Sequence, residues 1–296
     1  MDRSAQIKFP IPEEELLYSG HTACPGCGAA LALKYVLKGL GPRTIVVIPP
    51  ACAGTIAAGF PFSALKIPVL RIPFESTAIT ASGIRAALDV MGKEDIHVLA
   101  WAGDGGTYDI GLQALSGSAE RNDNIIYVCY DNEGYMNTGI QRSSSTPTGA
   151  WTTTTPSPYV KDTPKKDIVR IMAAHNIPYI ATASIGYPTD LIRKVNRAKE
   201  LKGMKFILIF SPCPTGWRYS SEMTIMIAKL ATETGIFPLY EIEDGEKYIL
   251  SPKRSEKPLR EYFALQGRFR NLTEDNLRWF EEKVQKEREY LKRLAG

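Results

Sequence analysis

Two short polar segments, each directly after a hydrophobic run, contain residues that could hold a metal diphosphate. They are Gly103–Gly106 (GDGG) and Asp131–Gly134 (DNEG). Glycines after a strand let the backbone turn sharply and approach a ligand closely. Asp104 and Asn132 can each supply an oxygen to Mg²⁺, which prefers few protein ligands beside phosphate oxygens and water. Together the two segments predict a cofactor that carries a diphosphate.

Each segment alone is weak evidence, because GDGG is also a common strand-to-helix turn and DNEG a common β-turn. The pair is stronger, since a helix and a strand of suitable length lie between them. A helix beginning near Tyr108 would aim free N–H groups at a phosphate. The dinucleotide pattern G-x-G-x-x-G and the Gly-Lys-Ser/Thr of a phosphate-binding loop are both absent.

The chain has five cysteines, Cys24, Cys27, Cys52, Cys129 and Cys213. An odd number in a chain without a signal peptide argues against a disulfide framework. Cys24 and Cys27 form a C-x₂-C pair, and Cys52 and Cys213 follow predicted strands, so four thiolates could meet at one edge of a sheet. Such a set suits zinc or a [4Fe–4S] cluster, and the spacing does not separate the two. Cys129 lies within a hydrophobic run and is expected to be a buried core residue.

Strands alternate with helices along the chain, which predicts an α/β fold with a parallel sheet and helices on both faces. In such sheets ligands bind at the carboxyl ends of the strands, where both polar segments lie. The predicted strands are 44–48, 96–102, 124–130, 178–183 and 206–211. The predicted helices are 29–39, 76–91, 109–120, 164–174 and 187–201.

We expect three regions along the chain. Residues 1–20 read as an extended arm, residues 21–235 as the domain that carries both sites, and residues 236–296 as a C-terminal extension. The extension ends in a charged helix over about 273–293, where Leu and Trp recur at helical spacing. Residues 142–158, rich in Ser, Thr and Pro, are expected to form a long loop.

The bulk composition is that of an ordinary globular protein. Of the 296 residues, 44% are hydrophobic and 23% charged, and the net charge of +4 is spread along the chain rather than clustered, which argues against a nucleic-acid partner. No apolar run approaches the ~20 residues that span a bilayer, and acidic residues stand where a signal peptide needs an apolar core. A cytoplasmic protein without a membrane partner is therefore expected.

The longer segments GDGGTYDIGLQALSGSAERN and DNEGYMNTGIQRSSSTP resemble the β subunits of pyruvate:ferredoxin oxidoreductase and its 2-oxoacid relatives, over roughly residues 18–220. The resemblance implies a thiamine diphosphate-binding fold of the diphosphate-binding type. It also implies a Mg²⁺ ion held by Asp104, the Asn132 side chain and the Gly134 carbonyl, and a catalytic Asn137 that faces the substrate. The residues expected to contact the cofactor are Cys52, Gly103, Asp104, Gly105, Gly106, Asn132, Gly134, Tyr135, Met136 and Asn137.

By the same resemblance, Cys24, Cys27, Cys52 and Cys213 would hold a [4Fe–4S] cluster. Thiamine diphosphate takes up electrons as CO₂ leaves a 2-oxoacid, and a nearby cluster can remove them one at a time. Coenzyme A would accept the acyl group and ferredoxin the electrons. A partner α subunit would supply the glutamate that the cofactor requires, with γ and ferredoxin-like δ subunits completing the enzyme.

Two positions qualify this expectation. Glu75 is the only attractive carboxylate near the predicted site, although a role in helix N-terminal electrostatics is the favoured interpretation. Ala29 stands where many relatives have Glu, so that polar contact with the cofactor is absent here.

The leading hypothesis is the catalytic β subunit of an enzyme that converts pyruvate, coenzyme A and oxidised ferredoxin to acetyl-CoA and CO₂, reversibly. The segment Tyr135–Gly139 (YMNTG) fits the pyruvate and branched-chain groups better than the 2-oxoglutarate group. A branched-chain or oxalate-using relative is one alternative. A non-redox thiamine decarboxylase half with structural zinc is another, and a non-catalytic diphosphate-binding regulatory module is a third.

Overall fold

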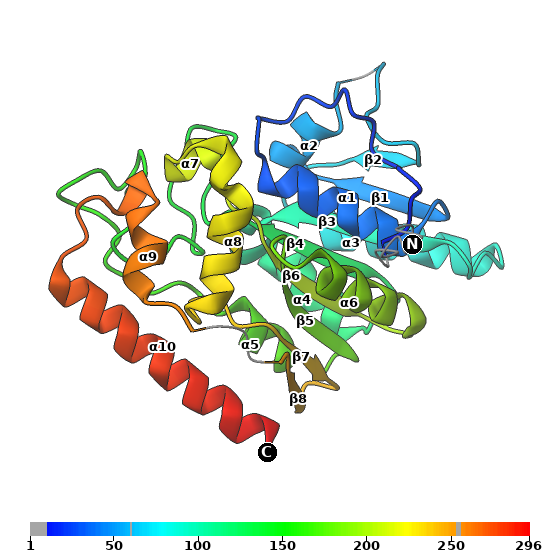
Figure 1. Ribbon diagram of the computed structural model, residues 1–296. Coiled ribbons are helices and arrows are strands. Elements are labelled where there is room, and N and C mark those ends of the chain that lie inside the picture. The colour runs from blue at the N-terminus through cyan, green and yellow to red at the C-terminus, as the bar shows by residue number, and fades with distance from the viewer. Residues whose placement is uncertain (1–10, 60, 253–255) are drawn as a thin grey trace, which may run out of the picture.

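The computed structural model describes residues 11–59, 61–252 and 256–296. Within these ranges the centre is an eight-stranded sheet with the order β2-β1-β3-β4-β6-β5-β7-β8 (Figure 1). The strands are β1 (Thr44–Ile48), β2 (Val69–Arg71), β3 (His97–Gly103), β4 (Ile126–Asp131), β5 (Tyr179–Ser184), β6 (Lys205–Phe210), β7 (Tyr240–Glu243) and β8 (Lys247–Leu250). β1 to β6 are parallel, which confirms the predicted α/β fold, while β7 and β8 add an antiparallel edge that was not predicted.

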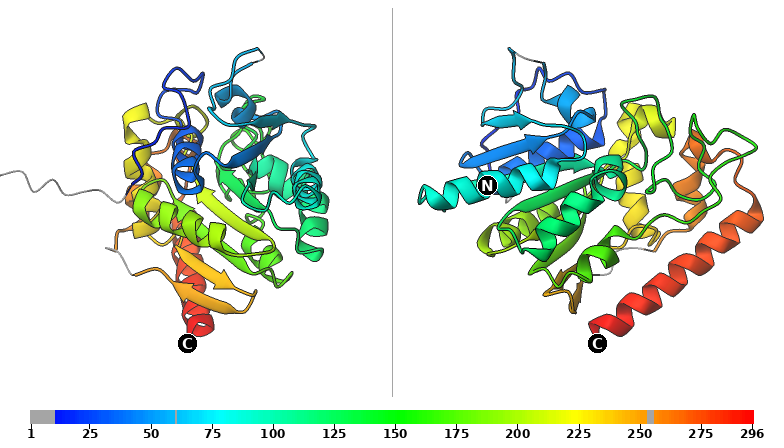
Figure 2. Two further views of the ribbon diagram at one scale, coloured as in Figure 1. Left: turned by 90° about the vertical axis from the view of Figure 1, so that its right-hand side faces the viewer. Right: turned by 180° about the vertical axis from the view of Figure 1, so that it is seen from behind.

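Helices cover both faces of the sheet (Figures 1 and 2). α1 (Gly28–Leu40) and α6 (Pro188–Glu200) pack on one face, and α3 (Thr77–Val90), α4 (Leu112–Glu120) and α5 (Ile168–Ala173) on the other. Buried side chains accordingly form two hydrophobic cores, one on each side of the sheet. The strands between them are continuous apolar runs because neither of their faces meets water.

The remaining helices lie at the strand ends and in the C-terminal part. They are α2 (Cys52–Ile56), a π-helical turn (Gly105–Asp109), α7 (Pro214–Trp217), α8 (Thr224–Glu233), α9 (Leu259–Ala264), α10 (Glu274–Ala295) and 3₁₀ turns at Ser221–Met223 and Gly267–Phe269. No helix among the described residues is long and apolar enough to cross a membrane.

The C-terminal segment ends in the helix that its charge pattern predicted. α10 begins with a reciprocal capping box between Thr273 and Asn276, in which each side chain accepts the backbone N–H of the other residue. Leu277, Phe280 and Leu291 of α10 are buried against the rest of the molecule. The hairpin β7–β8 extends the main sheet through β5, and the predicted boundary near residue 235 stays a prediction.

The predicted arm falls partly outside the described residues, since residues 1–10 are not among them. In the described part, Leu16 and Leu17 are buried, and Leu17 forms an isolated antiparallel bridge with Leu65. Leu16 and Leu17 therefore anchor the arm on the domain, while residues 12–14 and 18–20 are exposed.

Several local predictions were wrong, each for a local reason. The helix expected over 109–120 is two elements, because the chain first makes the π turn Gly105–Asp109 and α4 starts only at Leu112. The helix expected over 164–174 begins at Ile168, after Asp167 caps it by accepting the N–H of Arg170. Short elements such as α2, β2 and α7 were missed, since three to five residues are too few to show a hydrophobic period.

The register of the sheet brings three polar segments to one edge. Gly103 at the end of β3 pairs with Tyr130 of β4, and Asp131 pairs with Phe210 of β6. Beyond the last pair, the N–H of Ser211 donates to the carbonyl of Asp131 at 2.9 Å. The segments that begin at Gly103, Asp131 and Ser211 therefore leave the sheet side by side, as carboxyl ends of parallel strands must.

We predict that Gly39→Ala and Gly83→Ala change stability in opposite directions, although both glycines lie within helices. Alanine normally stabilises a helix interior relative to glycine by ~0.5–1 kcal/mol, and a Cβ at Gly83 meets nothing within 4 Å. A Cβ at Gly39 would lie 2.6 Å from Cγ1 of Val195 in α6, and such overpacking costs about 1–3 kcal/mol. Denaturation midpoints of both variants measure the difference, and equal stabilisation would contradict the close α1–α6 contact.

Candidate functional site

A cavity lies where β3 and β4 end, beside the start of α2. It is lined by all ten residues that the sequence predicted for the cofactor, Cys52, Gly103, Asp104, Gly105, Gly106, Asn132, Gly134, Tyr135, Met136 and Asn137. Its lining also includes Thr138 of the YMNTG segment, together with Pro50, Ala51, Phe74 and Tyr130, which the sequence analysis did not expect at the cofactor. The structure therefore brings the predicted set together, while the contacts of these residues with a cofactor stay predictions. We call this space the cofactor cavity.

The glycines of the first segment are required by aromatic rings packed against them. A Cβ on Gly103 would lie 3.0 Å from the ring of Tyr130, and one on Gly105 would overlap the ring of Tyr135. The Tyr135 hydroxyl is itself fixed, because it donates to Asp109 Oδ2 at 2.8 Å. Small residues thus keep the backbone exposed to the cavity between two rigid rings.

Three oxygen-bearing groups converge at the base of the cofactor cavity. One terminal atom of the Asn132 amide lies 2.9 Å from Asp104 Oδ1 and 2.9 Å from the carbonyl oxygen of Gly134. If that atom is nitrogen, it donates to both neighbours. If it is oxygen, three acceptors face one another, an arrangement that a hard cation such as Mg²⁺ stabilises. The predicted ligand set therefore fits a metal ion.

The electrostatics of Asp104 also favour a cation. Its carboxylate is buried and accepts a hydrogen bond from Ser143 Oγ at 2.5 Å. Burial, and then the nearby Asp131 carboxylate, raise the pKa of Asp104 well above its usual range. A charged Asp104 is thus costly in the protein alone, and a bound divalent ion would reverse that cost.

A buried ionic network holds the Asp131–Gly134 loop from behind. Lys165 Nζ lies 2.6 Å from Asp131 Oδ2 and 2.9 Å from Glu133 Oε1, and Arg268 Nη2 lies 2.7 Å from Glu133 Oε2. Burial alone would raise the pKa of Glu133, but Lys165 and Arg268 outweigh it and lower that pKa. The sequence gave no signal for this network, because Lys165 and Arg268 lie far from the loop along the chain.

The backbone of the same loop is fixed by side chains from distant segments. Trp217 Nε1 donates to the carbonyl of Asn132 at 2.7 Å, and Thr146 Oγ1 donates to the carbonyl of Glu133 at 2.8 Å. Glu133 adopts a positive φ of 62°, which is uncommon for a residue other than glycine. These bonds aim the neighbouring Asn132 and Gly134 at the cofactor cavity.

Four cysteines line a second cavity next to the first. They are Cys24, Cys27, Cys52 and Cys213, the four that the sequence predicted as ligands. Cys129 is fully buried in β4, as expected. We call this space the cysteine cavity, and Ala29 also lines it.

Close backbone packing brings the C-x₂-C hairpin to the Cys213 segment. The N–H of Cys27 donates to the carbonyl of Cys24 at 3.1 Å and closes the hairpin. A Cβ on Gly28 would lie 2.5 Å from the Pro212 carbonyl oxygen, so only glycine lets the two segments approach this closely. The N–H of Gly216 points at Cys213 Sγ, 3.3 Å away, as a thiolate ligand would require.

The protonation of the thiols bears on whether they hold a metal. Burial first, and the neighbouring thiols next, raise the pKa of Cys52 to about 12, so this thiol is stable as a thiolate only with positive charge nearby. Zinc and a [4Fe–4S] cluster both supply such charge.

The two cavities share three residues, Cys52, Asn132 and Asn137. Asn137 is held in this position by α2, since Thr55 Oγ1 donates to Asn137 Oδ1 at 3.2 Å. The carbonyl of Thr55 in turn accepts from Thr22 Oγ1 at 2.5 Å, next to the C-x₂-C hairpin. The hydrogen bonds therefore run from one cavity to the other.

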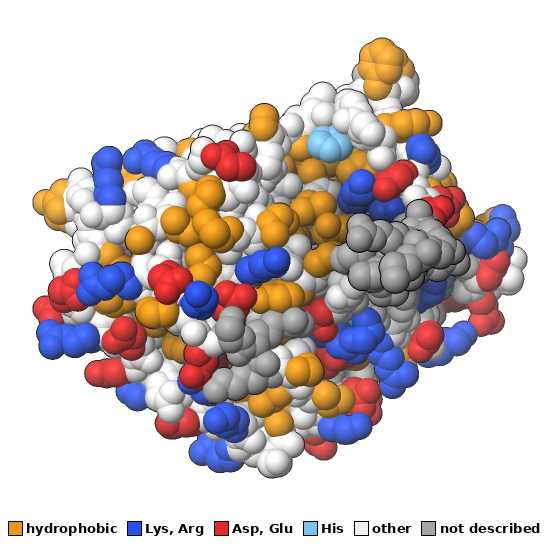
Figure 3. All heavy atoms as spheres, viewed as in Figure 1, with side chains coloured by type: hydrophobic (Ala, Val, Ile, Leu, Met, Phe, Trp, Pro, Cys, Tyr) orange, Lys and Arg blue, Asp and Glu red, His pale blue; other side chains and the backbone are white. Residues whose placement is uncertain are grey.

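No glutamate among the described residues lines the cofactor cavity. Phe74 lines it, but the adjacent Glu75, two residues before α3 in the sequence, is exposed. On the cysteine side, Cys24 is exposed, and hydrophobic side chains gather on the surface over α1 and α8 (Figure 3), among them Ile225 and Met226.

Comparison with known proteins decides the family. Residues 74–209 match the model of the thiamine pyrophosphate enzyme C-terminal TPP-binding domain. The chain is 51% identical to ketoisovalerate oxidoreductase subunit VorB of Pyrococcus furiosus, covering 97% of this chain and 96% of that protein. It is also 51% identical to pyruvate synthase subunit PorB of Methanothermobacter thermautotrophicus, covering 90% and 93%. The chain belongs to the thiamine diphosphate-dependent 2-oxoacid:ferredoxin oxidoreductase β subunits.

A solved structure supports the fold of this β subunit. The chain resembles a 2-oxoglutarate:ferredoxin oxidoreductase from Magnetococcus marinus with a TM-score of 0.59 and 21% identity, covering 76% of this chain and 82% of that one. The β subunit is one part of a multi-subunit 2-oxoacid oxidoreductase. The family assignment made from the two polar segments is thus confirmed.

We predict that Lys165→Met strongly destabilises the β subunit, because it leaves Asp131 and Glu133 buried with one cation fewer. Breaking a buried ion pair by removing one partner costs about 3–5 kcal/mol. Lys202→Met is the matched control, since that lysine pairs with Glu94 at the exposed surface, where such changes stay within about 0.5 kcal/mol. Chemical denaturation of both variants measures the contrast. Similar losses for the two would refute the proposed importance of the network.

Proposed function

We propose that this β subunit belongs to a pyruvate:ferredoxin oxidoreductase, which converts pyruvate and coenzyme A to acetyl-CoA and CO₂ in the cytoplasm. Electrons would pass through a [4Fe–4S] cluster to ferredoxin, and the reaction is reversible in principle. The observation that carries this proposal is the sharing of Cys52, Asn132 and Asn137 by the cofactor and cysteine cavities. A cofactor that donates electrons from the cofactor cavity would then lie next to a cluster that accepts them in the cysteine cavity.

The residues of the cofactor cavity have distinct proposed roles. Asp104, the Asn132 side-chain oxygen and the Gly134 carbonyl would hold Mg²⁺, and the Gly103–Gly106 backbone would approach the diphosphate. When bound, thiamine diphosphate supplies the chemistry, because it adds to a 2-oxoacid carbonyl and accepts electrons as CO₂ leaves. Asn137, fixed by Thr55, would position the substrate by hydrogen bonding.

The four cysteines would hold the cluster next to the cofactor. Their position next to the cofactor cavity, with Cys52 lining both cavities, favours a cluster that accepts electrons over structural zinc. The cluster would also supply the positive charge that the thiolates of Cys52 and Cys213 require, since burial raises both of their pKa values. Zinc would meet this requirement as well, so the closeness to the cofactor cavity is what favours the redox enzyme over a decarboxylase half with structural zinc.

The active centre would be completed by a partner. Thiamine enzymes need a glutamate at the aminopyrimidine, and no glutamate among the described residues lines the cofactor cavity. We therefore propose that an α subunit covers the cavity and contributes it. γ and ferredoxin-like δ subunits would carry electrons onward from the cluster.

The substrate is tested with the assembled enzyme. The relatives named for pyruvate and for ketoisovalerate are both 51% identical to this chain, over 90% and 97% of it respectively, so the branched-chain acid is the second candidate. Methyl-viologen reduction with coenzyme A is measured for pyruvate, 3-methyl-2-oxobutanoate, oxalate and 2-oxoglutarate. We expect the highest kcat/KM for pyruvate. A higher value for another acid would replace the proposed substrate, and no reduction with any of them would refute the proposed reaction.

We predict that Asp104→Ala abolishes Mg²⁺-dependent binding of thiamine diphosphate, because it removes the only carboxylate among the three converging groups. Titration calorimetry with the cofactor, with and without Mg²⁺, measures the effect, and activity should fall with binding. Asp95→Asn is the control, since Asp95 pairs with Arg43 at the exposed surface and does not line the cofactor cavity. Undiminished activity of Asp104→Ala would refute the assigned metal site.

We also predict that Cys213→Ser loses or destabilises the cluster, whereas Cys129→Ser keeps it, because only Cys213 lines the cysteine cavity. Anaerobically purified protein should be brown, with about four irons per chain for a [4Fe–4S] cluster. Iron analysis and visible absorbance of the two variants measure the contrast. A colourless wild-type protein with one zinc would instead support the non-redox alternative.

A further inference from the structure

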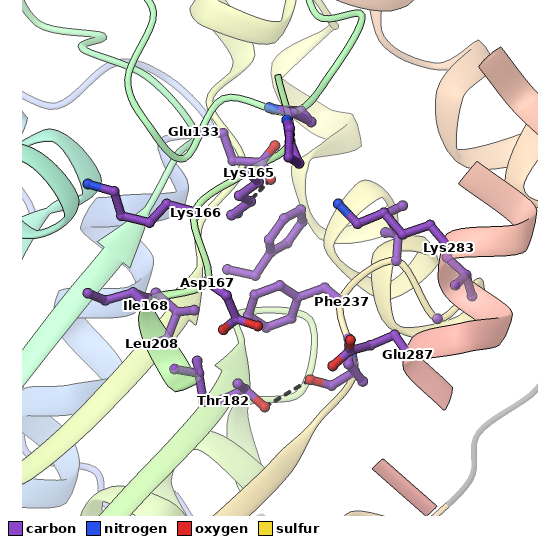
Figure 4. Close-up of a pocket in the computed structure, with 18 of the residues that line it drawn as sticks. Glu133, Lys165, Lys166, Asp167, Ile168, Thr182, Leu208, Phe237, Lys283 and Glu287 are labelled. Atoms are coloured by element: carbon purple, nitrogen blue, oxygen red, sulfur yellow. Dashed lines mark hydrogen bonds and ion pairs between the residues drawn. The ribbon is translucent and has the colours of Figure 1, made fainter. Parts of the chain in front are cut away.

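A larger cavity lies on the other side of the Asp131–Gly134 loop. Glu133 lines it, whereas the neighbouring Asn132 and Gly134 line the cofactor cavity. It has a volume of about 360 Å³ and lies between α5, the sheet and α10 (Figure 4). This volume is within the range of ligand-binding pockets in proteins. We call it the α10 cavity, and nothing in the proposed reaction uses it.

The walls of the α10 cavity are mostly apolar. Ile168 from α5 and Leu208 and Phe210 from β6 form one side, with Phe237 beside them. Val284 from α10 lies on the opposite side. Such walls suit a ligand whose body is aliphatic or aromatic, because burying its apolar surface contributes ~25 cal/mol per Å².

Four cationic side chains line the α10 cavity, and three of them are already paired with carboxylates. The pairs are Lys165 with Asp131 and Glu133, Lys166 with Asp109, and Arg170 with Asp167 and Glu287. The fourth cation is Lys283 of α10.

Lys283 has no hydrogen bond or ion pair within the part of the chain that the structure describes. Its ammonium extends from α10 toward the cavity in Figure 4, and it lies 5.1 Å from the centre of the Trp279 ring. Lys283 is exposed at the edge of the cavity, and partial loss of hydration lowers its pKa although the carboxylates of Glu287 and Asp167 act in the opposite direction. A single negative group at this position would be stabilised.

We propose that the α10 cavity binds a small carboxylic acid with an apolar body, its carboxylate paired with Lys283 and its body packed between α10 and Phe237. One unpaired cation matches one negative charge. A dianion such as a phosphate is disfavoured, because the carboxylates of Asp167 and Glu287 also line the cavity. The site is separate from the cofactor cavity and independent of which 2-oxoacid the enzyme oxidises.

The experiment measures the binding of octanoate, the probe, by titration calorimetry. The protein is the enzyme purified together with its partner subunits. We expect saturable binding with one site per β subunit, and at least tenfold weaker binding of the neutral octanamide. Lys283→Met should weaken octanoate binding at least tenfold. Lys286→Met is the matched control, because it removes the same charge from an equally exposed position of α10 that does not line the cavity, and it should leave binding unchanged.

A second variant tests the apolar part of the proposal. Val284→Trp would fill the cavity and should abolish octanoate binding, with thermal unfolding measured to show that the fold is retained. Absence of saturable binding to the assembled enzyme would overturn the proposal. Equal losses in Lys283→Met and Lys286→Met, or equal affinities for octanoate and octanamide, would overturn it as well.

Discussion

Two buried carboxylates in one loop set the main constraint on this structure. Asp131 and Glu133 flank Asn132, and burying them is costly unless positive charge is supplied inside the protein. Lys165 and Arg268 supply it, from the segment before α5 and from the 3₁₀ turn after α9. The C-terminal part of the chain is thereby tied to the loop that faces the cofactor cavity. Arg268 also stacks on Trp217, whose indole holds the Asn132 carbonyl.

The network explains how one short loop can present different groups to different sides. Asn132 and Gly134 face the cofactor cavity, Asn132 also reaches the cysteine cavity, and Glu133 faces the α10 cavity. A loop held only by its own backbone bonds would exchange among these orientations. The ion pairs with Lys165 and Arg268 fix one orientation of the loop. A site that must place a metal ligand accurately requires such support.

The cysteine cavity is likewise assembled from segments that lie far apart in the sequence. Its four cysteines come from the hairpin before α1, the start of α2 and the segment after β6. Gly28 permits the hairpin to touch the Pro212 carbonyl, and Thr55 ties α2 to Asn137. Small residues and single hydrogen bonds between these segments, rather than one continuous motif, bring the cavities into contact.

The sequence by itself determined the fold class, the family and the residues that gather at the strand ends. Apolar runs of strand length, glycines after them and cysteines at fixed spacing are local features. They can therefore be recognised from consecutive residues without knowledge of the fold. The sequence also indicated that Cys129 is a core residue. It did not indicate the antiparallel edge β7–β8 or the π turn at Gly105–Asp109, whose signals are too short or depend on packing.

Only the tertiary structure decided which distant charges meet. Lys165 and Arg268 carry no mark in the sequence that distinguishes them from surface residues, and Lys283 lies in a helix whose pattern is mainly charged. Whether such a side chain is paired, buried or left facing a cavity depends on segments far away along the chain. The physical reason is that burial and ion pairing are properties of the assembled interior, whereas turn and strand propensities are properties of a few consecutive residues.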